Sequence, residues 1–412
     1  MAAPLEGIRV LDLSRILAGP WASQTLADLG AEVIKVERPG AGDDTRGWGP
    51  PYHEGEDGAS VSAYFLAANR GKRSIAVEFA SAEGQAIIRR LAADSDILLE
   101  NYKVDGLAKY GLDYGSLRAV NPRLIYCSIT GFGQTGPYRA RSGYDFLLQA
   151  MGGLMSVTGE PDGEPMKVGV AITDLLTGLY AATAILAALH ERERSGEGQW
   201  IDLALFDVQV ATLANQASSF LVSGREPRRL GNAHPSIVPY QSFPTADGDM
   251  VVAVGNDEQY RRFVTAGGRA ELGIDERFRA NADRVRNRAS LVPLLAEMLR
   301  ERPTAEWLRI LEPLGVPCGP VNGLAATFAD PQVQARGMVR ALEHPVLGKV
   351  PSVASPLRFS RTPLRQDCAP PLLGENTEEV LRDVLNASES QLEAWRISGA
   401  IRPGRRGGSD PD

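Results

Sequence analysis

The chain has 412 residues, which predicts two or three domains rather than a single core. Hydrophobic residues make up 43% and charged residues 23%, as is usual for a globular protein. The net charge of −7 and the pI near 5.4 argue against a general nucleic-acid-binding protein, which normally presents a basic face.

The first forty residues predict a βαβ unit. Residues 8–14 (IRVLDLS) form a β-rich run, residues 21–30 (WASQTLADLG) a short helix, and residues 31–37 (AEVIKVE) a second strand. The alternation continues with strands at 74–79, 97–102 and 123–133 and a helix at 81–96 that Ser81 caps. This order predicts a parallel sheet covered by helices on both faces.

Beyond residue 143 the pattern becomes helical, with one more buried strand at 199–207. Residues 223–239 are rich in Arg, Gly, Asn and Pro and indicate a linker. A hairpin around Asp247-Gly248 follows, with helices at 258–266 and 290–299 and a further helix at 378–385. The sequence therefore predicts a smaller second domain in the middle of the chain.

Compartment and membrane association follow from three features. Cys127, Cys318 and Cys368 are widely spaced and odd in number, which is typical of a reducing compartment. The N-terminus leads directly into a strand without a signal segment. The most apolar helical stretch, residues 175–189, is shorter than the roughly 20 residues that span a bilayer. We expect a cytoplasmic protein with no membrane or nucleic-acid partner.

The sequence contains no GxGxxG after the first strand, no P-loop, no HExxH and no GxSxG, and its four histidines have no metal-ligand spacing. We therefore expect no metal and look to the carboxylates. Asp174 stands where an apolar run meets a long apolar helix, and Thr173 or Asp174 is the expected N-cap. The helix dipole there favours an ionised carboxylate, as a nucleophile requires. The alternative is a purely structural cap.

Eight stretches carry a family resemblance over nearly the whole chain: LDLSRILAGPWASQTLADLGAEVIKVERPGAGDDTRGWGPP, NRGKRSIAV, LLENY, LIYCSITGFGQTGPY, GYDFLLQA, VGVAITDLLTGLYAA, GVPCGPVN and PLLGENTEEVL. In this order and spacing the chain resembles the class III CoA-transferases, the family of formyl-CoA transferase. DDTRGWGPP, NAHPSIVPYQSF and VAVGN look closest to members that use succinyl-CoA and dicarboxylates such as glutarate or hydroxymethylglutarate.

The resemblance implies an α/β fold in which two chains interlock as a homodimer. A Rossmann-like large domain takes both chain ends, residues 1–222 and 330–400, and a smaller α+β domain with its linker takes residues 223–329. Residues 401–412 (IRPGRRGGSDPD) are predicted to form a disordered tail.

The resemblance also makes Asp174 the nucleophile of a CoA-transferase. Its carboxylate forms a mixed anhydride with the acyl group and then an aspartyl-CoA thioester, which the acceptor acid attacks. No tightly bound cofactor is implied, because coenzyme A is itself a substrate.

The same resemblance assigns residues to substrate binding. Those implied to contact CoA are Leu17, Ala18, Arg38, Asn101, Tyr102, Lys109 and Arg141. Arg46 and His234 are predicted to hold the distal carboxylate of a diacid, since arginine suits carboxylates. Taken singly, each has a plainer reading: a solvated charge, an Arg46 paired with Asp43 or Asp44, or a His234 that shapes a turn.

Three alternatives remain at this stage. The α-methylacyl-CoA racemases resemble the same family, but their catalytic histidine is replaced here by tyrosine in Gly143-Tyr144-Asp145, a poor base near neutrality. A non-catalytic CoA-binding protein is the second alternative. Hydrolysis of acyl-CoA is the third, if water enters the site.

Overall fold

The computed structural model describes residues 1–55, 58–402 and 404, which separate into two compact units. The large unit comprises Met1–Gly153, Val168–Ala217 and Gln332–Asp412, and the small unit comprises Leu154–Lys167 and Ser218–Pro331. The segment Leu154–Lys167, placed by sequence in the large domain, thus belongs to the small unit. Of the predicted disordered tail, residues 403 and 405–412 lie outside the described residues, whereas Ile401 is buried and forms a bridge with Val77.

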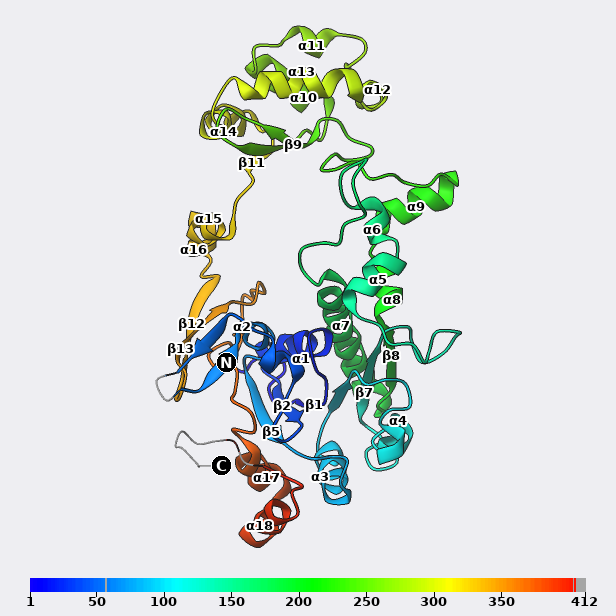
Figure 1. The fold of residues 1–412 in the computed structure, drawn as a ribbon, viewed down its shortest axis with the longest axis vertical. Helices are drawn as coiled ribbons and strands as arrows, with labels where there is room; N and C mark the ends of the chain where they lie inside the picture. The colour runs from blue at the N-terminus through cyan, green and yellow to red at the C-terminus, as the bar shows by residue number, and fades with distance from the viewer. Residues whose placement is uncertain (56–57, 403, 405–412) are drawn as a thin grey trace. The chain divides into compact units, whose positions relative to one another are not determined.

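The large unit is built on a six-stranded sheet in the order β5-β2-β1-β6-β7-β8 (Figure 1). The strands are β1 (Arg9–Asp12), β2 (Glu32–Glu37), β5 (Lys72–Ala76), β6 (Ile97–Glu100), β7 (Ile125–Thr130) and β8 (Trp200–Ala204). Every neighbouring pair is parallel. The predicted parallel α/β architecture is therefore confirmed.

Alternate residues of these strands enter two different hydrophobic cores. Leu11 and Ile34 pack on one face with helices α3 (Ala82–Ala93) and α17 (Thr377–Leu385). Their neighbours Val10 and Val33 pack on the other face with α1 (Ala18–Asp28) and α7 (Ile172–Ser195). Because side chains alternate across a strand, a sheet covered on both faces buries most strand positions, and β6 (ILLE) accordingly has apolar residues at three of its four positions.

The remaining elements of the large unit connect or flank this sheet. They are α2 (Ala63–Ala67), α4 (Tyr114–Arg118), α5 (Asp145–Met151), α8 (Leu205–Ala211), α16 (Pro331–Ala335), α18 (Glu389–Ile397), and two hairpins, β3 (Tyr52–Glu54) with β4 (Ser60–Ser62) and β12 (Val339–His344) with β13 (Gly348–Val353). Ser81 caps α3 as predicted, accepting a hydrogen bond from the N–H of Gly84 at 3.0 Å.

The strand order reverses between β1 and β6. The chain first adds β2 and β5 on one side of β1, and then β6, β7 and β8 on the other. Connections after β1 and β6 therefore leave the sheet in opposite directions, and a crevice opens between them at the carboxyl ends of the strands. This topology, rather than any sequence motif, determines where a ligand site forms in the large unit.

Helix α7 is longer than the apolar stretch predicted from the sequence. It spans 24 residues, and by length and composition it could cross a membrane. In the large unit, however, Ala181, Ile185 and Ala188 are buried in the core that contains β6, β7 and α1. Packing against the sheet accounts for the apolar composition of this helix.

The small unit has a three-stranded sheet, β11-β10-β9, made of β9 (Tyr240–Pro244), β10 (Asp249–Ala253) and β11 (Cys318–Pro320). The predicted hairpin around Asp247-Gly248 is confirmed by the antiparallel pairing of β9 and β10. The helices of this unit are α6 (Leu154–Val157), α10 (Asp257–Ala266), α11 (Glu271–Ile274), α12 (Asn281–Arg286), α13 (Arg288–Arg300), α14 (Thr304–Leu311) and α15 (Leu324–Ala329), and α9 (Ala214–Ser223) crosses the boundary between the units. Phe243, Phe263 and Trp307 form the centre of its core.

Candidate active site

A cavity of about 590 Å³ lies in the large unit where the strand order reverses. Its walls come from the turn after β1, the end of β2, the segment after β5, the loop after β6, the loop after β7 and the start of α7. The residues that matter most below are Arg15, Ile16, Leu17, Ala18, Arg38, Asp43, Asn101, Tyr102, Lys109, Arg141, Tyr144 and Asp174. Every lining residue belongs to the large unit.

Asp174 lies in the first turn of α7, but it is not the helix cap. The N-cap is Ala171, whose side chain makes no capping bond, so the expectation of Thr173 or Asp174 is wrong. Asp145, in the first turn of α5, takes over this function. Its Oδ1 accepts hydrogen bonds from the backbone N–H of Thr173 at 2.8 Å and of Asp174 at 3.3 Å. A carboxylate from another helix thus satisfies the free N–H groups at the start of α7.

The charge state of Asp174 also differs from expectation. Burial raises the pKa of Asp174 to about 7, and the nearby carboxylate of Asp145 raises it further in the same direction. Desolvation therefore outweighs the helix dipole, which by itself favours the ionised form. A carboxyl group that titrates near neutrality in a cavity is typical of a functional site.

Close packing between α1 and α7 places Asp174 beside the start of α1. Gly178, one turn after Asp174, faces α1: a Cβ at this position would lie 2.7 Å from the carbonyl oxygen of Ala18 and 3.0 Å from Cβ of Trp21. Only glycine permits this approach. As a result, the backbone of Leu17 and Ala18 lines the same cavity as the Asp174 carboxylate.

Cations surround this cavity. Arg38, Lys109 and Arg141, predicted from separate parts of the sequence, all line it, and Arg15, Lys103 and Arg139 add to them. Lys109 Nζ lies 4.6 Å from the ring centre of Tyr110, and the Arg141 guanidinium lies 4.5 Å from that of Tyr138. Cation–π contacts leave the charges available, so this rim suits a ligand with several phosphate groups.

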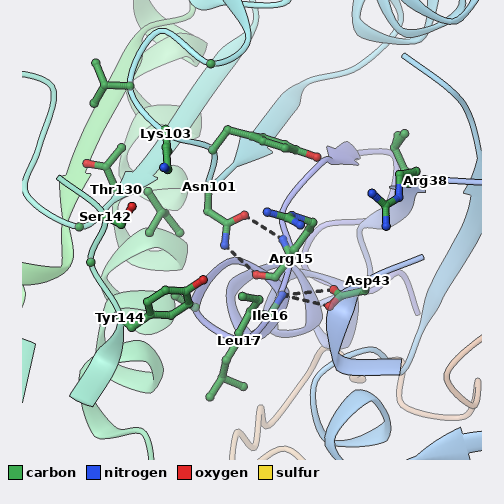
Figure 2. A pocket seen from close by; sticks show the side chains of 18 of the residues that line it. Arg15, Ile16, Leu17, Arg38, Asp43, Asn101, Lys103, Thr130, Ser142 and Tyr144 are labelled. Atoms are coloured by element: carbon green, nitrogen blue, oxygen red, sulfur yellow. Dashed lines mark hydrogen bonds between the residues drawn. The ribbon is translucent and has the colours of Figure 1, made fainter. Parts of the chain in front are cut away.

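Tyr102 supplies a flat apolar surface in the same cavity. Its ring meets Phe79 edge to face with 5.8 Å between centroids, and the Arg15 guanidinium lies 5.3 Å from its centre. Burial raises the pKa of Tyr102 to about 12, so the phenol is neutral at physiological pH. Asn101 behaves differently from the prediction: both ends of its side-chain amide bind the backbone of Arg15 (Figure 2).

Two predicted substrate residues lie elsewhere. Arg46 is not part of the cavity lining; its guanidinium binds both oxygens of the buried Glu37 at 2.7 Å and the carbonyl of Pro371 at 3.2 Å. It pairs with neither Asp43 nor Asp44. Arg46 is thus bound to other groups of the protein and does not line the cavity, in contrast to its predicted contact with substrate. His234 belongs to the small unit, where its Nδ1 accepts a hydrogen bond from the N–H of Ser236 at 3.1 Å.

Three residues of this region, Asp145, Tyr64 and Asp43, could not be predicted from the sequence. In the sequence, Asp145 stands out only as part of the Gly143-Tyr144-Asp145 stretch that lacks the racemase histidine. Tyr64 lies close enough that the carboxylates of Asp174, Asp145 and Asp43 add to the effect of burial in raising its pKa. Asp43 lines the cavity and binds the buried Lys35 at 2.9 Å. No spacing in the sequence connects these residues, because the contacts join separate loops.

The profile of CoA-transferase family III matches residues 5–377. The chain belongs to this family. Three similar proteins illustrate how close the match is. The family III transferase is 53% identical over 382 residues to succinate–glutarate CoA-transferase of Agrobacterium fabrum, covering 92% of this chain and 96% of the relative. It is 46% identical over 398 residues to succinyl-CoA:glutarate CoA-transferase of Mus musculus, covering 97% and 90%.

Among solved structures, the transferase is similar to a CAIB/BAIF family protein from Brucella suis. The TM-score is 0.84 at 52% sequence identity, covering 93% of this chain and 100% of the other.

Proposed function

We propose that this family III CoA-transferase moves coenzyme A from succinyl-CoA to glutarate or a closely related dicarboxylate. The relatives from Agrobacterium fabrum and Mus musculus, named for this reaction, support the choice of substrates. One structural observation carries the proposal: Asp174 shares a single cavity with Arg38, Lys109 and Arg141. A nucleophile and a set of phosphate-binding cations are the two requirements of acyl-CoA chemistry on a protein carboxylate.

The proposed reaction begins when the ionised Asp174 attacks the thioester carbonyl of succinyl-CoA. The C–S bond breaks, which gives a mixed anhydride and the CoA thiolate. The thiolate then attacks the aspartyl carbonyl of the anhydride, so succinate leaves and an aspartyl-CoA thioester remains. Glutarate attacks this thioester, a second anhydride forms, and the thiolate attacks its glutaryl carbonyl. Glutaryl-CoA departs and the Asp174 carboxylate is restored.

Each attack creates a tetrahedral oxyanion that requires hydrogen-bond donors. The start of α1 offers them. Leu17, the N-cap of α1, makes no side-chain capping bond, and among the described residues no acceptor binds the N–H of Leu17 or Ala18. We therefore assign these two N–H groups to the thioester carbonyl oxygen of acyl-CoA and to the oxyanion that forms from it. We assign the phosphates of CoA to Arg38, Lys109 and Arg141, and its adenine to Tyr102.

The distal carboxylate of the diacid requires a further binding residue. We do not assign Arg46 to it, because its guanidinium binds Glu37 and Pro371 and does not line the cavity. His234 remains our candidate from the small unit, since its Nε2 is not used in a described contact while Nδ1 is.

We also propose that the active form is an interlocked homodimer in the cytoplasm. Support comes from an apolar surface on α7 and its neighbour α5, with Leu179 and Tyr180 exposed by 46% and 47% and Phe146 by 58%. Exposed apolar patches of this kind mark interaction surfaces. Light scattering after size exclusion should give twice the chain mass of 44.3 kDa. The monomer mass would refute the dimer.

The test of the function is mass spectrometry of products from succinyl-CoA and a panel of acids: glutarate, hydroxymethylglutarate, mesaconate, oxalate and carnitine. Glutarate labelled with ¹⁸O in its carboxylates should yield glutaryl-CoA and leave one ¹⁸O on Asp174, which the next turnover passes to succinate. Asp174→Asn is the control and should produce no labelled succinate. Release of free CoA instead would indicate hydrolysis, and exchange of only the α-proton of a branched acyl-CoA would indicate the racemase.

A further inference from the structure

The turn that connects β1 to α1 has an unusual backbone. Ile16 has φ +71°, in the left-handed region that β-branched residues rarely adopt. Among the described residues, the other non-glycine positions with positive φ are Asp105, Ala214 and Asn386, none of them β-branched. Such a conformation persists only where surrounding contacts impose it, and it clusters at active sites. Ile16 is immediately followed by Leu17 and Ala18, which line the cavity.

Side chains from two other loops and from strand β2 hold this turn (Figure 2). Asn101 Oδ1 accepts a hydrogen bond from the N–H of Arg15 at 2.8 Å, and Asn101 Nδ2 donates to the carbonyl of Arg15 at 2.7 Å. Asp43 accepts from the N–H of Ile16 with both oxygens, at 3.2 and 3.3 Å. Lys35 Nζ donates to the carbonyl of Ser14 at 2.9 Å. Side chains therefore bind both the N–H and the carbonyl of two consecutive peptide groups.

These contacts are built into the interior rather than added at the surface. The side chains of Lys35 and Asp43 are both 0% exposed and form an ion pair at 2.9 Å. Burial opposes ionisation of Asp43, but Lys35 and the N–H and hydroxyl of Thr45 lower its pKa to about 2. The acceptor for the Ile16 N–H is thus a charged group, which strengthens the hydrogen bond.

The turn sets the position of the first residues of α1 relative to Asp174. The start of α1 packs against α7, because Gly178 of α7 has no Cβ and the carbonyl of Ala18 can approach it closely. The only covalent connection of α1 to β1 is the turn itself. A small displacement of the turn would therefore move the N–H groups of Leu17 and Ala18 away from a carbonyl attacked by Asp174.

We infer that Asn101 is a positioning residue for CoA transfer: by binding the N–H and the carbonyl of Arg15, it keeps Ile16 in the left-handed conformation and the Leu17 and Ala18 donors on the reacting carbonyl. This inference rests on the proposed function. It changes the expected phenotype of Asn101, because a residue that only binds CoA affects KM, whereas a residue that positions oxyanion donors affects kcat.

The test is the Asn101→Ala variant of the full chain, assayed with the acyl-CoA and acid that wild type turns over fastest. We expect kcat to fall about 10- to 100-fold, as small misplacements of a site do, with KM for the acyl-CoA within about 3-fold. Asn121→Ala is the matched control. Asn121 also binds backbone groups on two sides, with its Nδ2 on the carbonyls of Ala92 and Ser95 and its Oδ1 on the N–H of Arg123, but it lies outside the cavity lining. Its kcat should stay at the wild-type value.

Replacement of Ile16 separates positioning from direct contact. Glycine adopts positive φ without strain, so Ile16→Gly needs less help from Asn101. In the Asn101→Ala background we expect Ile16→Gly to restore kcat at least about 5-fold. A rise in KM with unchanged kcat, or the absence of rescue, would overturn the inference.

A crystal structure of the Asn101→Ala protein gives a readout that does not depend on turnover. We expect residue 16 to leave the left-handed region, and an unchanged φ with Leu17 and Ala18 in place would equally refute the role. Failure of wild type to use succinyl-CoA and glutarate contradicts the proposed substrates alone, since the kcat ratios and the structure are measured with any active pair.

Discussion

The raised pKa of Asp174 predicts that the nucleophile destabilises the folded protein. A carboxylate with ordinary pKa 3.8 in the unfolded chain titrates at about 7 in the folded one, because burial and Asp145 both disfavour its charge. A group whose pKa is raised by folding favours the folded state only while it is protonated. Its cost therefore begins above pH 3.8, grows with pH, and is complete above pH 7. Asp174→Asn removes the charge with almost no change in shape.

The size of the effect follows from the shift. One pKa unit corresponds to about 1.4 kcal/mol, so at pH 8 the ionised Asp174 costs about 4 kcal/mol in free energy of unfolding. At pH 5 the folded protein keeps Asp174 protonated while the unfolded chain ionises it, and the cost falls to about 2 kcal/mol. We expect Asp174→Asn to be more stable than wild type by these amounts and to be inactive.

The assay is urea denaturation followed by tryptophan fluorescence at pH 5 and pH 8. Asp207→Asn is the matched control, because Asp207 lies in the first turn of α8 but is exposed. Loss of its favourable interaction with the helix dipole should lower stability by up to about 1 kcal/mol, the opposite sign. If Asp174→Asn gained nothing at pH 8, the argument from burial would be refuted. An equal gain at both pH values would show that packing, not charge, is responsible.

Three further predictions concern Asp145, Arg46 and Gly178. Asp145→Asn keeps an acceptor for the N–H of Thr173 but removes the negative charge beside Asp174. We expect the acid limb of the kcat–pH profile near pH 7, from Asp174, and this limb should move to lower pH in the variant. An unmoved limb in steady-state kinetics would contradict the prediction. Arg46→Met leaves the buried Glu37 without its ion-pair partner and should lower the free energy of unfolding by about 3–5 kcal/mol. The KM for glutarate of the folded variant should stay within about 2-fold of the wild-type value. A large rise in this KM would show that Arg46 binds substrate. Gly178→Ala forces α1 and α7 apart and should lower the free energy of unfolding by about 1–3 kcal/mol, measured by thermal melting. We also expect kcat to fall. Unchanged activity would show that the spacing of the two helices does not affect catalysis.

Much of the fold could be predicted because its information is local. The run IRVLDLS, the helix WASQTLADLG and the run AEVIKVE each carry their own pattern, and the short loops between them leave few ways to arrange a βαβ unit. The cap of α3 by Ser81 and the hairpin at Asp247-Gly248 are equally local. The apolar stretch of residues 175–189 is shorter than α7 as a whole, because the last turns of this helix are polar.

The sequence likewise predicted part of the candidate site. The family resemblance directed attention to Asp174, Arg38, Lys109 and Arg141, and the cavity brings these four together from different loops.

Only the tertiary structure decided how these groups are held and charged. Asp145 reaches the start of α7 from α5, and Arg46 is bound by Glu37 and by Pro371, 325 residues away along the chain. These contacts join segments distant in sequence, and the pKa of Asp174 depends on how completely such segments exclude water. By itself the sequence determined which segments become strands and helices and which residues can carry the chemistry. The tertiary structure decided which groups each side chain binds and how far it is shielded from water, because both depend on the residues that surround it in space.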